Sequence, residues 1–293
     1  MDISVIIPVY NDKTLRECLQ HITVCDTPNL TLEIIVVDNN SAEWVKKCIE
    51  QFPVRYVQEK KQGSYAARNA GIRHASGSIL AFLDADCFAA RDWLQTIARI
   101  FENDTIDGVM GFSRGSGTTP VARFEQRMYA ENIARFTNAA RLERIDTRNV
   151  AVRRRAIDKV GLFNEALKFG GDWEYGARMH ANGCNIIFEP QMNVDHAHPT
   201  KLCGLLQKRI RQNMGNMNIL AFHDAEFLQK YFAPLYAAWI IKPMSRRYRI
   251  LFYTICSWIL FPMATLARSY FFFKAANVLA IRLGQLKGLQ KQR

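Results

Sequence analysis

The chain has 293 residues, of which 49% are hydrophobic and 23% charged, and this composition is typical of a folded globular protein rather than a disordered one. Its seven scattered cysteines form no C-x-x-C pair, which argues against both a disulfide framework and a structural zinc cluster. The net charge of +12 comes from residues 201–293, which contain 15 basic and two acidic residues. The chain is therefore not a uniformly basic nucleic-acid binder. Its basic C-terminal part predicts contact with an anionic surface.

Strand-like and helix-like segments alternate through the first hundred residues. Apolar runs with little polar alternation predict buried strands, and the stretches of about 10–15 residues between them predict helices. The strands are predicted at Ile3–Tyr10, Thr31–Asp38, Val54–Gln58 and Ser78–Asp84, and the helices at Asp12–Val24, Ala42–Phe52, Ser64–Ala75 and Arg91–Phe101. This order indicates an α/β fold with a mostly parallel central sheet that is covered on both faces.

The two ends of the chain differ in their predicted surroundings. The run Ile3–Val9 follows the acidic Asp2 and ends at turn-forming residues, so we interpret it as a strand rather than a signal peptide and expect a cytoplasmic protein. Ile250–Ala267 contains 18 residues without a charge, at the lower limit for crossing roughly 30 Å of hydrocarbon. Ser269–Ile281 combines aromatic residues with Lys274, which is typical of a helix among lipid headgroups.

From these features we expect residues 223–293 to form a basic, apolar helical tail that associates with the cytoplasmic face of a membrane. A simple membrane span usually has more basic residues on one side than on the other, but this apolar run has arginines on both sides. They are Arg246, Arg247 and Arg249 before it and Arg268 after it. A buried helical hairpin and a true membrane span remain as alternatives.

Polar or acidic side chains follow three of the predicted strands. The first ends around Tyr10-Asn11, the second at Asp38, and the fourth at Asp84-Ala85-Asp86. In a parallel sheet, ligands bind beyond the carboxyl ends of the strands. The chain contains no G-x-G-x-x-G and no G-K-[ST], which argues against a dinucleotide fold and a P-loop. The acidic residues instead predict a site for a divalent cation and hydroxyl-rich groups.

Several segments resemble family 2 glycosyltransferases, inverting enzymes with the GT-A fold. SVIIPVYND (4–12), EIIVVDNNS (33–41), QGSYAARNAGI (62–72) and ILAFLDAD (79–86) are similar to the nucleotide-binding half of that family, and residues 147–190 are similar to its acceptor half. Each motif alone is weak, but their order is specific. The resemblance implies a GT-A catalytic domain over residues 1–222, with a nucleotide-binding half at 1–112 and an acceptor half at 113–222.

The resemblance also implies which side chains bind the nucleotide-sugar donor. Pro8 and Tyr10 would shape the nucleobase pocket, and Asp38 would accept hydrogen bonds from the base or the ribose. The remaining implied donor-binding residues are Arg68 and Asn69, which would steady the nucleotide, and Asp84, which would hold the ribose.

The implied metal and base residues lie further along the chain. Asp86 would bind a Mn²⁺ or Mg²⁺ ion that bridges the diphosphate, and His196 falls where relatives often carry a metal-proximal histidine. Asp172 matches the family's catalytic base. One base and one metal imply a single displacement with inversion at the anomeric carbon. Gly171 stands where the family usually has a glutamate, so the supporting role of that glutamate is absent or has moved to Glu174.

Each of these residues also has a structural interpretation. Asp38 would otherwise form a turn or cap the next helix, Asp84 and Asp86 would be solvated turn residues, and Asp172 would be a helix N-cap. Cys87 is interpreted as a small packing residue.

Basic residues follow His196 within Lys201–Asn216. Arg209 and Arg211, with Lys208, would clamp the leaving diphosphate, and the alternative is a solvated or lipid-facing side of a helix. This segment lacks the Q-x-x-R-W of processive polysaccharide synthases, so we do not expect repeated sugar addition.

Together these features predict a metal-dependent inverting glycosyltransferase. It would move a single sugar from a nucleotide-diphosphate sugar to a membrane-presented glycan or lipid-linked acceptor, such as a surface-polysaccharide precursor. One rival is a nucleotidyltransferase acting on sugar phosphates, which would need a glycine-rich phosphate loop that Pro8–Lys13 lacks. The other is a non-catalytic membrane scaffold that retains the fold. Nucleic-acid binding is not expected, because the aromatic residues of the tail cluster in apolar runs.

Overall fold

The computed structural model describes residues 2–27, 30–137, 142–198, 200–235 and 250–291, except 252, 259, 262 and 265–269. Its strands are β1 (Asp2–Val9), β2 (Thr31–Asp38), β3 (Arg55–Gln58), β4 (Ile79–Leu83), β5 (Cys87–Ala89), β6 (Gly108–Ser116), β7 (Asn149–Arg153) and β8 (Ile186–Ala197). Its labelled helices are α1 (Leu15–Thr23), α2 (Glu43–Ile49), α3 (Ser64–His74), α4 (Trp93–Ile100), α5 (Pro120–Thr137), α6 (Arg154–Val160), α7 (Gly171–Ala181), α8 (Leu202–Asn216), η1 (Met217–Ala221), α9 (Ala225–Tyr231) and α12 (Tyr270–Lys291).

The chain divides into two compact units. The first consists of Met1–Ser116, Asn132–Glu165 and Asp172–Ala197, and the second consists of Gly117–Glu131, Ala166–Gly171 and His198–Arg293. The boundaries expected from the sequence, after residues 112 and 222, stay predictions.

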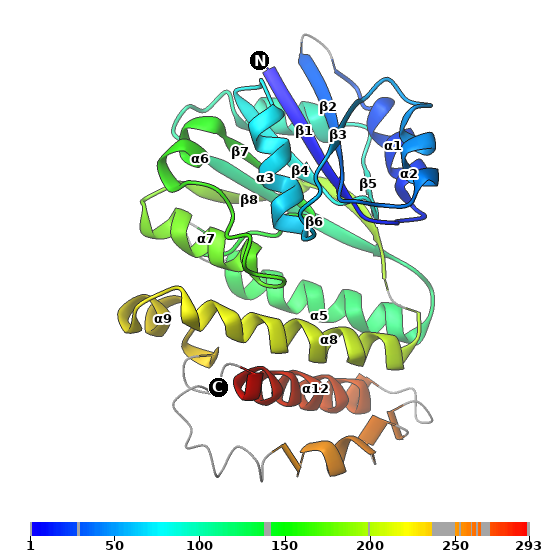
Figure 1. Ribbon diagram of the computed structural model, residues 1–293, viewed down its shortest axis with the longest axis vertical. Coiled ribbons are helices and arrows are strands. Elements are labelled where there is room, and N and C mark those ends of the chain that lie inside the picture. The colour runs from blue at the N-terminus through cyan, green and yellow to red at the C-terminus, as the bar shows by residue number, and fades with distance from the viewer. Residues whose placement is uncertain are drawn as a thin grey trace. The chain divides into compact units, whose positions relative to one another are not determined.

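An eight-stranded sheet forms the centre of the first unit, in the order β3-β2-β1-β4-β7-β6-β8-β5. Strands β3, β2, β1 and β4 run parallel to one another, as does β6 to β8, whereas β7 is antiparallel to both β4 and β6, and β5 is antiparallel to β8 (Figure 1). This arrangement confirms the predicted α/β fold with a mostly parallel sheet.

Strand β1 shows why its sequence is apolar at nearly every position. Val5 and Ile7 belong to the core between the sheet and helices α1, α2 and α4. Ile6 points to the other face, where a Cβ added at Gly71 of α3 would lie 2.3 Å from Ile6 Cγ2. Both faces of the strand are therefore covered, and only glycine allows α3 to approach this closely.

Helix α1 begins at Leu15, three residues later than the apolar pattern predicts. The carboxylate of Asp12 accepts a hydrogen bond from the Thr14 backbone N–H at 2.9 Å, and Asp12 Oδ1 also lies 2.5 Å from Thr14 Oγ1. The chain thus makes a side-chain-stabilised turn before the helix. Thr14 Oγ1 also lies 3.1 Å from the Ala85 carbonyl, so this turn contacts the acidic segment that follows β4.

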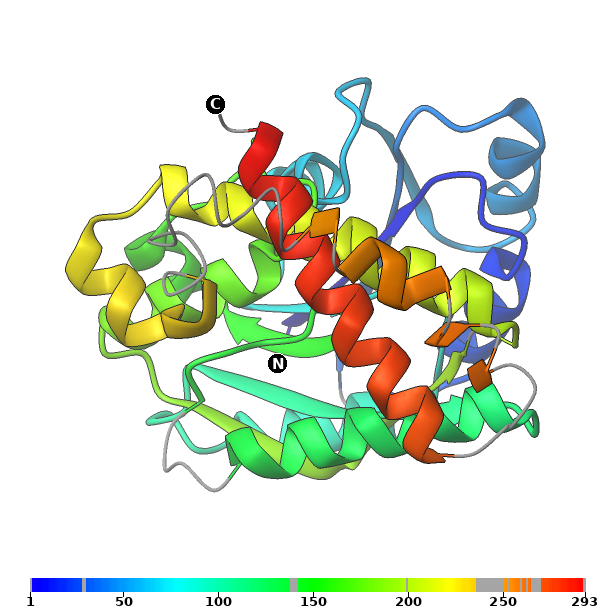
Figure 2. The same ribbon diagram turned by 90° about the horizontal axis from the view of Figure 1, so that it is seen from below.

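Helices α8 and α12 pack closely in the second unit (Figure 2). A Cβ at Gly284 would lie 2.4 Å from the Ile210 carbonyl oxygen, and one at Gly288 would lie 2.4 Å from that of Met214. Glycines on α12 therefore permit backbone contact with α8. The apolar core around this contact includes Phe124 of α5, Leu205 and Leu206 of α8, and Phe273 and Ala276 of α12.

The predicted apolar tail falls partly within the described residues. Helical residues occur between 250 and 264, whereas residues 265–267 of the apolar run, and the flanking Arg246, Arg247, Arg249 and Arg268, lie outside the described part of the chain. Among the described residues, no helix is both long enough and apolar enough to cross a membrane.

Candidate active site

A pocket of about 350 Å³ lies at the carboxyl ends of β1 and β4 in the first unit. Five residues predicted from the sequence line it, namely Pro8, Tyr10, Arg68, Asp84 and Asp86. Its remaining lining residues are Val9, Asp12, Asn39, Gln62, Gly63, Ser64, Ala67 and Ala85. Tyr10 is 58% exposed, so its aromatic face is accessible to a flat ligand.

Asn39 shapes one wall of this pocket. Its side-chain amide donates to the carbonyls of Glu59 and Lys61, and its side-chain oxygen accepts from the Gly63 backbone N–H at 2.7 Å. All the bonding groups of this side chain are thereby used to hold the loop that leads into α3. Gly63 itself has a φ of 139°, which favours glycine at this position.

Asp38 is buried behind the pocket and is not on its wall. Its Oδ1 accepts from the Ser41 backbone N–H at 2.8 Å, and its Oδ2 accepts from the Tyr56 hydroxyl at 3.0 Å. Burial, together with this bond to Asp38, raises the pKa of Tyr56 to about 12. The Asp38 carboxylate therefore connects the turn after β2 to β3, and direct contact of Asp38 with a base or ribose stays a prediction.

Arg68, which is buried, forms an ion pair through its Nη2 with Oδ1 of the partly exposed Asp84. The Arg68 side chain is 4% exposed, and its Nε has no hydrogen-bond partner among the described residues. The guanidinium also lies 5.7 Å from the ring centroid of Tyr65. Arg68 also lines the open pocket, where a guanidinium is suited to bind an anionic ligand.

A second ion pair, between Asp146 and Arg148, lies close enough to Asp84 to affect its charge. Burial raises the pKa of Asp84, and the negative charges of Asp86 and Asp146 add to this effect, whereas Arg68 and Arg148 oppose it. Arg148 itself binds the Asp146 carboxylate in a bidentate manner, with its Nε 2.9 Å from Oδ1 and its Nη2 2.5 Å from Oδ2. Burial favours neutral Asp146, but this arginine holds the Asp146 pKa below its ordinary value.

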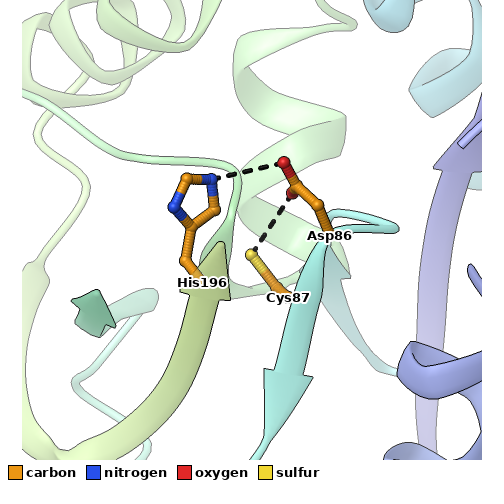
Figure 3. Close-up of side chains that lie close together, drawn as sticks. All are labelled: Asp86, Cys87 and His196. Carbon is orange, nitrogen blue, oxygen red and sulfur yellow. Dashed lines mark hydrogen bonds and ion pairs between the residues drawn. The ribbon is translucent and has the colours of Figure 1, made fainter. Parts of the chain in front are cut away.

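Asp86, Cys87 and His196 come together in three dimensions (Figure 3). Cys87 of β5 pairs in register with His196 of β8, and this pairing brings the imidazole Nε2 to 3.3 Å from Asp86 Oδ2. One ligand atom from each of the three residues lies within 4.8 Å of the others. Burial raises the pKa of Cys87 well above its ordinary value, so the group stays a neutral thiol.

This donor set suits some metals better than others. A carboxylate oxygen and an imidazole nitrogen are compatible with Mn²⁺, and the carboxylate is also compatible with Mg²⁺. A protonated thiol is a poor ligand for either ion. Asp86 and His196 therefore fit the cation that the sequence predicted, and Cys87 fits its predicted role as a packing residue.

Asp172 lies in the first turn of α7. Its Oδ1 accepts from the Trp173 backbone N–H at 2.9 Å and from the Tyr65 hydroxyl at 3.3 Å. Burial, reinforced by the charge of Asp146, raises the pKa of Asp172 to about 6, although Arg68 opposes this shift. A carboxylate with a pKa near 6 is ionised at neutral pH and is more basic than an ordinary aspartate, which suits a general base.

Glu174, to which the role of the glutamate replaced by Gly171 was expected to move if it is kept, forms an ion pair within α7. Its carboxylate is 2% exposed and binds Arg178, with Oε1 2.7 Å from Arg178 Nε. Arg178 also donates to the carbonyls of Val160 and Leu162. Glu174 is therefore part of the packing of α7 against the segment that follows α6, and the supporting role suggested for it stays a prediction.

Asn69 is directed away from the pocket. Its amide nitrogen donates to the Phe163 carbonyl and to Glu165 Oε1, and its oxygen accepts from the Phe163 backbone N–H. These bonds favour a role in holding the segment around Phe163, and the predicted contact with a nucleotide stays a prediction.

The arginines predicted to clamp the diphosphate belong to the second unit. Arg209 Nη2 lies 2.5 Å from Glu125 Oε2, and its Nε donates to Asn277 at 3.1 Å. These bonds connect α8 to α5 and α12, so they favour a packing role for Arg209. Arg211 is exposed on α8. The clamping role of both residues stays a prediction.

Besides the other residues that line the pocket, the charged or aromatic side chains near it that sequence reasoning missed include Tyr65, Arg144, Asp146 and Arg148. Tyr65 lies within the QGSYAARNAGI segment, three residues before Arg68. This spacing on a predicted helix places the two side chains on the same face and could have identified Tyr65. Arg144 lies 3.6 Å from the ring centroid of Trp173, next to the candidate base. Asp146 and Arg148 precede β7, and Arg148 falls at the start of the segment 147–190 that resembles the acceptor half of the family, although neither residue was assigned a role there.

Comparisons with known proteins place the chain in a family. Residues 4–161 match the sequence model of Glycosyl transferase family 2. Glycosyltransferase AglE of Haloferax volcanii is 34% identical over 256 residues, which cover 82% of this chain and 80% of that protein.

Two solved structures are similar in fold. Mannosyltransferase PcManGT from Pyrobaculum calidifontis, in complex with GDP-Man and Mn²⁺, aligns with a TM-score of 0.70 and 22% identity over 99% of this chain and 88% of its own. S. aureus TarS 1-349 in complex with UDP-GlcNAc aligns with a TM-score of 0.56 and 14% identity over 100% of this chain and 92% of its own. The family match and the 34% identical relative together establish that the chain belongs to glycosyl transferase family 2 and is a glycosyltransferase with the GT-A fold.

Proposed function

We propose that this glycosyltransferase transfers one sugar, with inversion, from a nucleotide-diphosphate sugar to an acceptor presented at a membrane. The observation that carries the proposal is the grouping, within the first unit, of an open pocket lined by Arg68, Asp84 and Asp86 with a carboxylate, Asp172, whose pKa is raised to about 6. A donor site and a base in one compact unit are the two elements that a single displacement requires.

The pocket supports a nucleotide-sugar donor through its charges. The guanidinium of Arg68 lines the pocket and is suited to an anionic group, Asp84 is suited to accept from ribose hydroxyls, and Tyr10 offers an exposed ring for the base. The solved structures with GDP-Man and UDP-GlcNAc show that similar folds hold either guanosine or uridine donors. We therefore leave the choice of base to a donor panel.

A divalent cation, with Mn²⁺ favoured by the imidazole, would be held by Asp86 and His196. When bound, it would neutralise charge on the leaving diphosphate. Asp86 lines the pocket, and His196 lies behind it at 3% exposure, so the histidine also orients the Asp86 carboxylate. The PcManGT structure contains Mn²⁺, which supports the same ion here.

Asp172 would take the proton from the acceptor hydroxyl. Its raised pKa strengthens it as a base while leaving it ionised at neutral pH, and general-base assistance of this kind contributes about 10²–10⁴ in rate. With the base on one side of the sugar and the leaving diphosphate on the other, a single displacement inverts the anomeric carbon.

A membrane-presented acceptor, such as a lipid-linked or surface-polysaccharide precursor, is supported by the second unit. Large apolar side chains are exposed there, including Trp258 at 79% and Phe271 at 74%. A groove of about 530 Å³ between residues 253–260 and α12 is apolar apart from Lys274 and Arg282. Exposed aromatic residues beside cations favour the headgroup region of an anionic membrane.

The experiment compares Asp172→Asn with Asp86→Ala. We expect Asp172→Asn to lose transfer while it keeps metal-dependent nucleotide affinity, because asparagine retains the shape but cannot accept the proton. Asp86→Ala should lose metal-dependent nucleotide binding. Full turnover in Asp172→Asn would exclude this residue as the base. Release of pyrophosphate instead of a nucleoside diphosphate would indicate a nucleotidyltransferase.

A further inference from the structure

The hydroxyl of Tyr65 makes two contacts with the same residue, Asp172. It donates to Asp172 Oδ1 at 3.3 Å and accepts from the Asp172 backbone N–H at 3.2 Å. The backbone and the carboxylate of one residue are thus bridged by a single hydroxyl, which restricts rotation of the carboxylate about the Cα–Cβ bond. Tyr65 lies on α3 and Asp172 lies on α7, so the contact connects two separate helices of the first unit.

Tyr65 is itself firmly held. Its side chain is buried, and its ring stacks on that of Phe163, with the centroids 5.7 Å apart. On the same helix, the guanidinium of Arg68 lies 5.7 Å from the centroid of the Tyr65 ring and pairs with Asp84 on the pocket wall. One fixed tyrosine therefore contacts both the candidate base and the arginine of the donor pocket.

We propose that Tyr65 is a positioning residue whose hydroxyl holds the Asp172 carboxylate in the orientation needed to accept the acceptor proton. This inference rests on the proposed function, in which Asp172 is the base. Tyr65 does not exchange a proton with the substrate in this account; it acts only through Asp172. Its loss should therefore reduce turnover while leaving donor affinity nearly unchanged.

The charges that face Asp172 determine the direction of a pH effect. Asp146 raises the Asp172 pKa and Arg68 lowers it, while Arg144 is a third charged group that interacts with this carboxylate. The Tyr65 hydroxyl donates to the carboxylate, so it stabilises the ionised form relative to the protonated form. Removing the hydroxyl should therefore move the Asp172 pKa upward from about 6.

Tyr175 provides a matched control. Its ring also stacks on that of Phe163, with the two centroids 4.2 Å apart, and its hydroxyl donates to the Gly161 carbonyl at 2.9 Å. Both Tyr65→Phe and Tyr175→Phe remove one buried hydroxyl and keep the ring. Only Tyr65→Phe removes hydrogen bonds to Asp172.

The test measures turnover, donor KM and the pH dependence of turnover for both variants, using release of nucleoside diphosphate. The bond from Tyr65 to the Asp172 carboxylate is the one that orients the base, and losing a bond of this kind changes an equilibrium or a rate roughly tenfold. We therefore expect Tyr65→Phe to lower kcat about tenfold with donor KM nearly unchanged, and to move the acidic limb of its pH profile to higher pH. Tyr175→Phe should lose stability without either effect. Equal kcat and equal pH profiles in the two variants would overturn the inference.

A second measurement does not depend on turnover. Carbon-13 titration of the Asp172 carboxyl by NMR should show a higher pKa in Tyr65→Phe than in the unmodified protein, and no change in Tyr175→Phe. An unchanged Asp172 pKa in Tyr65→Phe would contradict the inference. The Asp172→Asn variant separates the two proposals: if it is inactive while Tyr65→Phe behaves like Tyr175→Phe, the base assignment stands and only the role of Tyr65 fails.

Discussion

The imidazole Nε2 of His196 lies 3.3 Å from Oδ2 of Asp86, although the two residues are far apart in the sequence. The antiparallel pairing of β5 with β8, which places Cys87 opposite His196, creates this proximity. The short strand β5 begins directly after Asp84-Ala85-Asp86, so its pairing with β8 places Asp86 next to His196. The candidate cation site is thus a consequence of strand register at the edge of the sheet.

Asp172→Asn should stabilise the protein at neutral pH. The pKa of Asp172 is raised in the folded state to about 6, so the fold favours the protonated form and loses stability as pH rises from about 4 to about 6. Asparagine removes this loss and keeps an acceptor for the Trp173 backbone N–H. We expect a gain of about 2 kcal/mol at pH 7.5 and little difference at pH 4, measured by urea unfolding. A variant that is less stable at pH 7.5 would contradict the burial of a charged Asp172.

Arg68→Met should destabilise the protein, because it leaves the Asp84 carboxylate without its buried partner. Breaking such a pair costs about 3 kcal/mol. Lowering the pH should reduce the difference as Asp84 becomes protonated. The control is Lys47→Met, which breaks the exposed Lys47–Glu43 pair and should cost less than about 0.5 kcal/mol. Equal losses in the two variants, measured by urea unfolding, would show that the Arg68 pair is not effectively buried.

Asn149→Leu should also destabilise the fold. The Asn149 amide donates to the carbonyls of Phe112 and Met192, and its oxygen accepts from Trp93 Nε1. Leucine leaves these buried groups unpaired, at a cost of about 3 kcal/mol in the free energy of unfolding. Asn182→Leu removes a comparable bond at an exposed site and should change stability by less than about 0.5 kcal/mol.

Trp258→Glu and Phe271→Glu should weaken membrane binding. Each exposed aromatic residue loses about 2 kcal/mol of apolar transfer energy, or more than tenfold in affinity. The measurement is co-sedimentation with phosphatidylcholine vesicles, with and without phosphatidylglycerol. Trp44→Glu is the control, since Trp44 is 41% exposed in the first unit. Equal binding by all three variants would argue against the membrane role of the tail.

Elements made from continuous sequence were predictable. The strands of the parallel half were predicted because both faces of the sheet are covered and the apolar runs are therefore uninterrupted. Pro8, Tyr10, Asp84 and Asp86 were expected at the strand ends and do line one pocket, since parallel strands bring their carboxyl ends to the same edge.

Contacts between distant segments were not predictable from local patterns. Asp146 and Arg148 lie close to Asp84 because β7 lies between β4 and β6 in the sheet. The spacing of apolar residues along the chain predicts strands, but it does not predict which strands become neighbours. Asn69 follows Arg68 directly, but successive helical residues point about 100° apart, so only Arg68 lines the pocket. The acidic partner of Arg209 is Glu125 on α5, which a basic cluster within α8 does not reveal.

The most direct test of the central claim is release of nucleoside diphosphate from a panel of UDP-, GDP- and dTDP-sugars by the purified full chain in detergent. Each donor is assayed with Mn²⁺, with Mg²⁺ and with EDTA, and Asp86→Ala is assayed in parallel. We predict release from one donor that requires a divalent cation and is lost in Asp86→Ala. Release that persists in EDTA and in Asp86→Ala would contradict metal-assisted transfer. The absence of both release and donor-induced thermal stabilisation would contradict the nucleotide-sugar site itself.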